Sequence, residues 1–158
     1  MTDQGRQPII VGVDGSDLSV AALRHARVFA DALDSPVEAI AAWNYQAAPG
    51  TFTPVLWNPA EEAEKVLRDA LGRAFGDRPP AQIVSHAVHG HPAQVLIDAG
   101  RGARMLVLGS CGRGGFAGRL LGSVSTACAA HAPCPVLIVR ADPDMEAGER
   151  TMDSSTHR

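Results

Sequence analysis

The feature that most constrains the fold of this chain is the regular alternation of short apolar runs with longer helical patterns. Five runs of six to nine residues are apolar and rich in branched side chains, a length and composition typical of buried strands. They are residues 8–14, 35–43, 82–88, 104–109 and 135–140. Because strands that alternate with helices are joined by crossovers, the pattern predicts a parallel sheet with helices on both faces.

Helix signals fill the segments between these runs. Ser16 is positioned to cap the first helix, and Asn58, Pro59 and Glu61 form the start signal of the second. The first helix is expected to bury one face, made of Leu18, Ala22, Ala26, Phe29 and Leu33. The second should bury a stripe of Ala63, Val66, Leu67, Ala70, Leu71, Ala74 and Phe75, and should end at Pro79 and Pro80. Shorter helices are expected through 92–99 and 123–131.

Length and charge limit the classes of protein that fit. A chain of 158 residues suits one domain, expected over 7–141 with flexible tails at 1–6 and 142–158. The net charge of −3 argues against a nucleic-acid or membrane surface, and no apolar run reaches the length of a membrane span. The polar start lacks the apolar stretch of a signal peptide, and the three cysteines lack metal-site spacing. These features predict a protein of the reducing cytoplasm.

A glycine-rich segment, GSCGRGGFAGRLLGSVS at 109–125, follows the fourth expected strand directly. In open parallel sheets ligands bind beyond the carboxyl ends of the strands, which is where this segment begins. Glycine permits positive φ and lets a ligand approach the backbone, so that free N–H groups can converge on an anion. A helix that starts at Ser123 adds its own N–H groups, and Ser123 and Ser125 add hydroxyl donors. The segment favours a phosphate cradle, with a flexible turn without ligand as the alternative.

Other nucleotide and catalytic motifs do not fit the chain. The phosphate-binding GxxxxGK[ST] loop needs a lysine, and the one lysine, Lys65, stands in the second expected helix. No pattern of nucleophile and general base is evident near the glycine-rich segment, so no catalytic residue is predicted and the chain is at most a slow ATPase. Residues 44–58 are aperiodic and contain prolines, which is typical of either a binding lid or a disordered crossover.

The glycine spacing matches one further pattern. Gly109, Gly112 and the pair at 122–123 form Gx2Gx9G[ST], which resembles the nucleotide-binding signature of the universal stress protein family. Three more segments occur in that family's order: VGVDGS at 11–16, GHPAQVLIDAG at 90–100 and CPVLIVR at 134–140. The resemblance implies a five-stranded parallel sheet of order 3-2-1-4-5, the adenine nucleotide alpha hydrolase-like fold, and an ATP site that uses Mg²⁺.

The same resemblance implies roles for particular residues. Gly12 and Asp14 would lie under the nucleotide, with Asp14 near the ribose or ligating the phosphate-bound metal. The backbone of Trp43 would meet adenine, and Leu108 and Gly109 would contact the ribose. The phosphates would be held by Gly112, Gly122, Ser123, Val124 and Ser125.

Two readings stay open for each of three further residues of the glycine-rich segment. Arg113 and Arg119 either pair with phosphate or are solvated surface residues. Cys111 stands at a position that is often basic in relatives, and is read either as an inert loop residue or as a redox-sensitive thiol.

Three functions remain open at this level. The chain is an ATP-binding regulatory protein of the stress response, a cyclic AMP binder of the same fold, or a dimeric interaction protein without nucleotide. Residues 135–140 would form an edge strand that is apolar on both faces, and such an edge invites pairing with a second chain. A homodimer through this strand is therefore expected, as the resemblance also implies.

Overall fold

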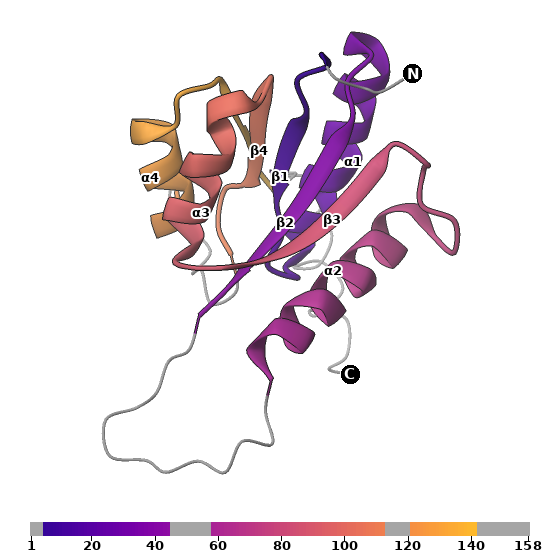
Figure 1. Ribbon diagram of the computed structural model, residues 1–158, viewed down its shortest axis with the longest axis horizontal. Helices are drawn as coiled ribbons and strands as arrows, with labels where there is room; N and C mark the ends of the chain where they lie inside the picture. Colours follow the sequence, from indigo (N-terminus) through magenta and orange to yellow (C-terminus); the bar gives the residue numbers. More distant parts are fainter. Residues whose placement is uncertain (1–4, 45–57, 113–120, 142–158) are drawn as a thin grey trace, which may run out of the picture.

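A parallel sheet lies between two pairs of helices in the computed structural model, which describes residues 5–44, 58–112 and 121–141 (Figure 1). The sheet has five parallel strands in the order β3-β2-β1-β4-β5, so the predicted architecture and strand order are confirmed. The strands are β1 (Ile9–Gly12), β2 (Val37–Trp43), β3 (Ile83–His89), β4 (Met105–Gly109) and β5 (Val136–Val139). The expected tail at 142–158, the aperiodic stretch 45–57, and Arg113 and Arg119 lie outside the described residues.

The helices divide between the two faces of the sheet. They are α1 (Asp17–Leu33), α2 (Pro59–Phe75), α3 (Pro92–Ala99), followed by the short 3-10 helix η1 (Gly100–Gly102), and α4 (Ser123–His131). Figure 1 shows α1 and α2 on one side of the sheet and α3 and α4 on the other. Two apolar cores result, and β1 serves both, since Ile9 and Val11 face the first core while Ile10 faces the second.

The predicted helix starts are confirmed, whereas one predicted helix end is wrong. Ser16 Oγ accepts from the Ser19 N–H at 3.2 Å, and Asn58 Oδ1 accepts from the Ala60 N–H at 3.1 Å. The helix α2 ends before the expected prolines because Gly76 adopts φ of 75° and donates its N–H to Gly72 O at 2.8 Å. This left-handed backbone is accessible to glycine at little cost, so glycine rather than proline terminates the helix.

The buried face of α1 differs from the predicted one. Ala22 and Ala26 are buried as expected, but Phe29 and Leu33 are 37% and 38% exposed. The face that packs on the sheet is instead centred on Leu23, which is fully buried with Val20 and Ala30 nearby on the same face. The helix carries two overlapping apolar stripes, and contact with the sheet selects one of them. In α2 the predicted stripe is confirmed, with Ala63, Leu67 and Ala70 buried and the other members packed against the same core.

Among the described helices, none has both the length and the apolar character that crossing a membrane requires.

The two stripes of α1 can be told apart by matched truncations. Leu23→Ala should lower the free energy of unfolding by about 2–5 kcal/mol, because it leaves a cavity in the core. Leu33→Ala, the same change on the half-exposed stripe, should cost less than about 1 kcal/mol. Urea unfolding of both variants measures the difference. Equal losses would show that the exposed stripe of α1 is also packed.

Candidate functional site

A pocket of about 580 Å³ opens at the carboxyl ends of β1, β2 and β4. It lies at the point where the strand order reverses, because β1 pairs with β2 on one side and with β4 on the other. Every described member of the predicted site lines it: Gly12, Asp14, Trp43, Leu108, Gly109, Gly112, Gly122, Ser123, Val124 and Ser125. Arg113, the remaining member, lies outside the described residues. The structure thus gathers residues from four distant segments of the chain around one cavity.

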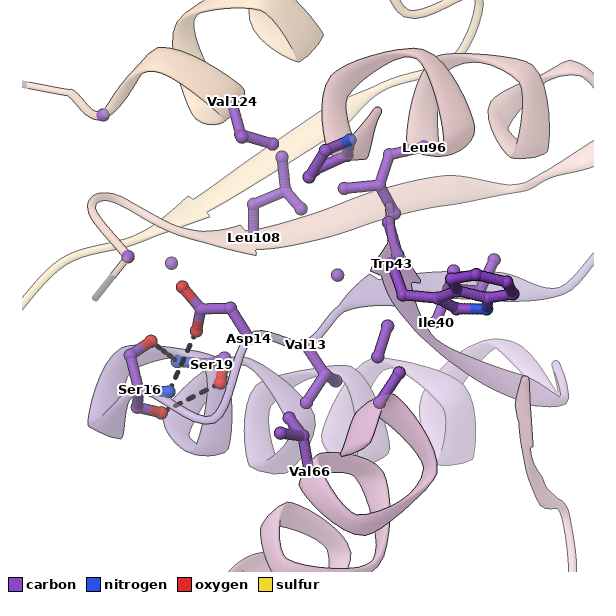
Figure 2. A pocket seen from close by; sticks show the side chains of 18 of the residues that line it. Val13, Asp14, Ser16, Ser19, Ile40, Trp43, Val66, Leu96, Leu108 and Val124 are labelled. Atoms are coloured by element: carbon purple, nitrogen blue, oxygen red, sulfur yellow. Dashed lines mark hydrogen bonds between the residues drawn. The ribbon is translucent and has the colours of Figure 1, made fainter. Parts of the chain in front are cut away.

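The turn after β1 directs a carboxylate into this pocket. Asp14 Oδ1 accepts from the Ser16 N–H at 2.9 Å, while Ser19 Oγ donates to Ser16 O at 2.9 Å (Figure 2). These bonds tie the turn to the first turn of α1. The other carboxylate oxygen of Asp14 lies against Gly112, so close that a Cβ at that position would collide with it. The Asp14 side chain therefore brings the turn after β1 into contact with the loop after β4 at Gly112.

The motif glycines are required for close packing and not for positive φ. Among the described glycines, positive φ occurs at Gly15, Gly76 and Gly90, none of which belongs to the Gx2Gx9G[ST] pattern. A Cβ at Gly109 would come within 2.7 Å of Leu18 Cβ and 3.1 Å of the Leu18 backbone carbon. The suggestion that these three glycines supply unusual backbone angles is wrong, because none of them has positive φ; Gly109 instead lets Leu18 of α1 pack closely, and Gly112 makes room for the Asp14 carboxylate.

The amino end of α4 is open toward the pocket. Its N-cap is Gly122, which has no side chain to cap the helix, and the first hydrogen bond within the helix is from Thr126 N–H to Gly122 O at 2.9 Å. Ser123, Val124 and Ser125, whose N–H groups precede that bond, all line the pocket. Uncapped N–H groups and the helix dipole make such an end suited to an anion. Gly122 itself is held to the β4 loop, since its N–H donates to Ser110 O at 2.6 Å.

The two serines of this turn have different surroundings. The buried Ser125 hydroxyl donates to Gly109 O at 2.6 Å, so its one hydrogen is used within the protein. In this structure the Ser125 side chain fastens α4 to the end of β4, and the predicted phosphate contact of Ser125 stays a prediction that its backbone N–H could fulfil. The side chain of Ser123 is exposed at the pocket.

The opposite end of the pocket is largely apolar and was not predicted in full. Ala41 of β2 and one face of α2 line it on one side of the sheet, while Ile40 of β2 and Leu96 of α3 line the facing wall on the side of α4. Figure 2 shows Val66 of α2 across the pocket from Leu96 and Leu108. The sequence does not distinguish these residues from ordinary core residues, because an apolar stripe looks the same whether it faces the core or lines a cavity.

Trp43, at the end of β2, is anchored toward β3. Its ring meets the His89 ring edge to face, with centroids 4.7 Å apart and an interplanar angle of 61°. Its carbonyl accepts from the Gly90 N–H at 2.8 Å, which ties the end of β2 to the turn after β3.

The charged side chains of the described pocket lining are both acidic. They are Asp14 and Glu62, from the β1 turn and from α2. Across the described ranges, no group of three or more histidine, cysteine or acidic side chains gathers as a metal site. Mg²⁺ commonly binds through one or two carboxylates together with phosphate oxygens and water, so a single carboxylate such as Asp14 fits a metal that arrives with a phosphate ligand.

The three cysteines occupy different environments. Cys111 is half-buried and lines the pocket. Burial raises the pKa of the Cys128 thiol, and the neighbouring Cys134 thiol raises it further; burial also raises the pKa of Cys134. Cys128 belongs to the core between the sheet and the helices α3 and α4, and Cys134 packs against that core.

Comparison with known proteins identifies a single family. The universal stress protein family model matches residues 5–140. A universal stress protein of Mycolicibacterium smegmatis is 33% identical over 138 residues, which cover 85% of this chain and 46% of that protein. The chain thus spans about half the length of the curated relatives it matches.

Two solved structures combine this fold with a nucleotide. A universal stress protein crystallised in complex with cAMP is 32% identical, with a TM-score of 0.60 and coverage of 84% of this chain and 95% of that one. The universal stress protein from Archaeoglobus fulgidus in complex with dAMP is 25% identical, with a TM-score of 0.61 and coverage of 84% and 97%.

The contrast between the two serines can be measured. Ser125→Ala should lower the free energy of unfolding by about 1–2 kcal/mol, because it removes the hydrogen bond from a buried hydroxyl to the Gly109 carbonyl. Ser123→Ala removes an exposed hydroxyl and should change stability by less than about 0.5 kcal/mol. Thermal unfolding of both variants gives the comparison. If Ser125→Ala melted like the parent, the bond to Gly109 would not support the loop.

Proposed function

The chain belongs to the universal stress protein family, and on that premise we propose that it is a regulatory protein of the stress response that binds ATP with Mg²⁺ in this pocket. The observation that carries the proposal is the polarity of the pocket. One end presents the uncapped amino end of α4, and the other is an apolar wall from β2 and α2. Phosphates suit the first end and a nucleoside suits the second.

The phosphate end offers backbone donors in place of a lysine. The N–H groups of Ser123, Val124 and Ser125, the dipole of α4 and the Ser123 hydroxyl would neutralise part of the phosphate charge. Mg²⁺ would supply the rest, with Asp14 as its protein ligand. Gly112 and Gly122 would let the phosphates approach the backbone, and Arg113 remains a proposed phosphate partner. Leu108 and Gly109 would contact the ribose, Gly12 would lie beneath the nucleotide, and the Trp43 backbone would meet adenine.

Cyclic AMP is the second candidate ligand. The 32% identical relative solved in complex with cAMP supports it. Charge supports it as well, because a cyclic monophosphate carries less negative charge than ATP into a pocket whose described charged side chains are both acidic. Denaturation of freshly purified protein, followed by chromatography of the released nucleotide, separates ATP, cyclic AMP and an empty pocket. The cytoplasmic setting expected from the sequence stays a prediction.

Substitution of Gly122 tests the phosphate site. Its φ of −71° and ψ of 168° are accessible to any residue, and the close backbone contacts of a Cβ there require only a small local shift of the loop, so Gly122→Val should fold. The valine side chain would stand beside Cys111 and Ser110, whose backbone atoms lie 3.3 Å and 3.5 Å from a Cβ built there, and would block the approach of phosphate. With each charge-assisted hydrogen bond at roughly 1.5–3 kcal/mol, loss of two weakens binding about a hundredfold or more. Calorimetric titration with Mg-ATP and with cyclic AMP measures this.

The matched control for this experiment is Gly102→Val. Gly102 is exposed, a Cβ there has no neighbour within 4 Å, and the residue does not line the pocket. The Gly102→Val protein should therefore bind nucleotide with the affinity of the parent. A folded Gly122→Val protein with parental affinity would contradict the phosphate assignment. If the parent bound no adenine nucleotide, an interaction protein with an empty pocket would replace the proposal.

We also propose a homodimer through residues 135–140. β5 is an edge strand, and Val136, Leu137 and Ile138 are only half-buried in the isolated chain. Leu137 packs toward the core beneath α1, and Val136 and Ile138 pack toward the core beneath α4, so both faces of the edge are apolar. An edge of this kind is completed by pairing with a second copy.

Charge placed on this edge should separate the dimer. Val136→Lys combined with Ile138→Lys should give a monomer by light scattering at micromolar concentration, because two buried ammonium groups would face each other across the interface. The control is Val84→Lys on β3, the opposite edge strand, where the native valine is already 48% exposed. A parent that is monomeric, or a double variant that remains dimeric, would contradict the β5 interface.

A further inference from the structure

We propose that Glu62 selects the nucleoside in this pocket, by accepting a hydrogen bond from a donor group that the nucleoside carries. The donor is either the exocyclic amino group of the base or a hydroxyl of the ribose. The inference rests on the proposed nucleotide site and adds to it a specificity-determining residue that the glycine motif does not contain.

Glu62 stands on the one face of α2 that is otherwise apolar. Pro59, Glu62, Ala63 and Val66 have the spacing of a single helix face, and all four line the pocket. Deeper along α2, the same side of the helix continues as the buried Leu67 and Ala70 of the core. The start of α2 is fixed by the Asn58 cap and by proline at the first helical position, which sets which residues face the cavity. The stripe therefore changes from apolar to carboxylate at the point where it leaves the core for the pocket.

The carboxylate of Glu62 is available to a ligand. Within the described part of the chain it has no hydrogen-bond or ion-pair partner, whereas Asp17 pairs with Arg73 and Asp31 pairs with Arg27. Glu62 also lines a second, smaller hollow of about 220 Å³, which Lys65 and Arg73 line as well. Arg73 is already engaged by Asp17 and by Gly15 O, at 3.1 Å from the latter. Glu62 thus stands on the border of the main pocket, and no ion pair among the described residues, with Lys65 of the same hollow included, engages its carboxylate.

The position of Glu62 decides which part of a nucleotide it meets. α2 packs on β2 and β3, and its pocket face lies on the same side of the sheet as Ala41 of β2. The open end of α4 belongs to the far side of the sheet, next to β5. Phosphate would be repelled by a carboxylate, so phosphates belong at α4 and a neutral donor belongs at Glu62. Amino and hydroxyl groups are the donors on a nucleoside, and a carboxylate is a strong acceptor for both.

If Glu62 served only to stabilise α2, Glu61 would have the same effect. Glu61 and Glu62 both lie in the first turn of α2, where an acidic side chain interacts favourably with the helix dipole. Both residues are exposed, but Glu61 does not line the pocket, whereas Glu62 does. Glu61→Ala therefore removes the same charge from the same helix turn and serves as the matched control.

The test compares Glu62→Ala, Glu61→Ala and the wild type by calorimetric titration. The reference probe is ATP with Mg²⁺ or cyclic AMP, whichever the wild type binds more tightly. Each analogue probe lacks one donor group of the reference. The inosine analogue lacks the amino group of the base, and the 2′-deoxy analogue lacks the 2′-hydroxyl. When ATP is the reference, 3′-deoxy-ATP tests the 3′-hydroxyl. Glu62→Ala should bind the reference about tenfold more weakly, while Glu61→Ala binds it like the wild type. The wild type should bind one of the analogues about tenfold more weakly than the reference. Glu62→Ala should bind that analogue and the reference with equal affinity.

The outcomes separate the inference from the function on which it rests. Loss of discrimination against the inosine analogue assigns the base amino group, and loss of discrimination against a deoxy analogue assigns the ribose. If Glu62→Ala, with a parental melting temperature, bound and discriminated every probe like the wild type, the role of Glu62 would be overturned while nucleotide binding stood. If the wild type bound no adenine nucleotide, both proposals would be overturned together.

Discussion

The pocket depends on the pairing of β1 with a parallel neighbour on each side. β2 lies on one side of β1 and β4 lies on the other. After β1 the chain first builds the sheet toward β2, and later returns to add β4 on the opposite side of β1. The connecting helices consequently diverge to opposite faces of the sheet at this point. Strand ends in this position have no helix directly above them, and a crevice follows from the connectivity itself. The residues that matter for a ligand are those that happen to end β1, β2 and β4.

Close packing at the rim keeps this crevice in shape. Gly109 lies against Leu18 of α1, and its carbonyl receives the Ser125 hydroxyl of α4. Gly122 donates its N–H to Ser110 O, which follows β4 directly. The end of β4 is thereby fixed to a helix from each face of the sheet. A side chain at Gly109 would disturb the packing of α1 before it touched any ligand, so part of the glycine signature serves the scaffold.

The charges of the rim are arranged by element. Backbone dipoles at α4 favour negative charge, Asp14 stands beside that end as the proposed metal ligand, and Glu62 places a second carboxylate on α2, across the sheet. An elongated ligand with an anionic end and a donor-rich end matches this gradient, and a nucleotide has that form. The separation of the two ends follows from the strand order, because β1 intervenes between β2 and β4.

The sequence by itself determined the number and order of the elements, the parallel sheet, and the helix starts at Ser16 and Asn58, since these depend on neighbours within a few residues. The strand order and the residues of the glycine-rich site came from a family resemblance carried by spaced motifs. Only the tertiary structure decided which stripe of α1 is buried. Leu23 and Leu33 both lie on apolar stripes of the helix, and only packing against the sheet determines that Leu23 is the buried one. It likewise showed that Ser125 bonds to Gly109 and that Glu62 joins the pocket. Such facts depend on contacts between segments far apart in the chain, which local periodicity does not contain.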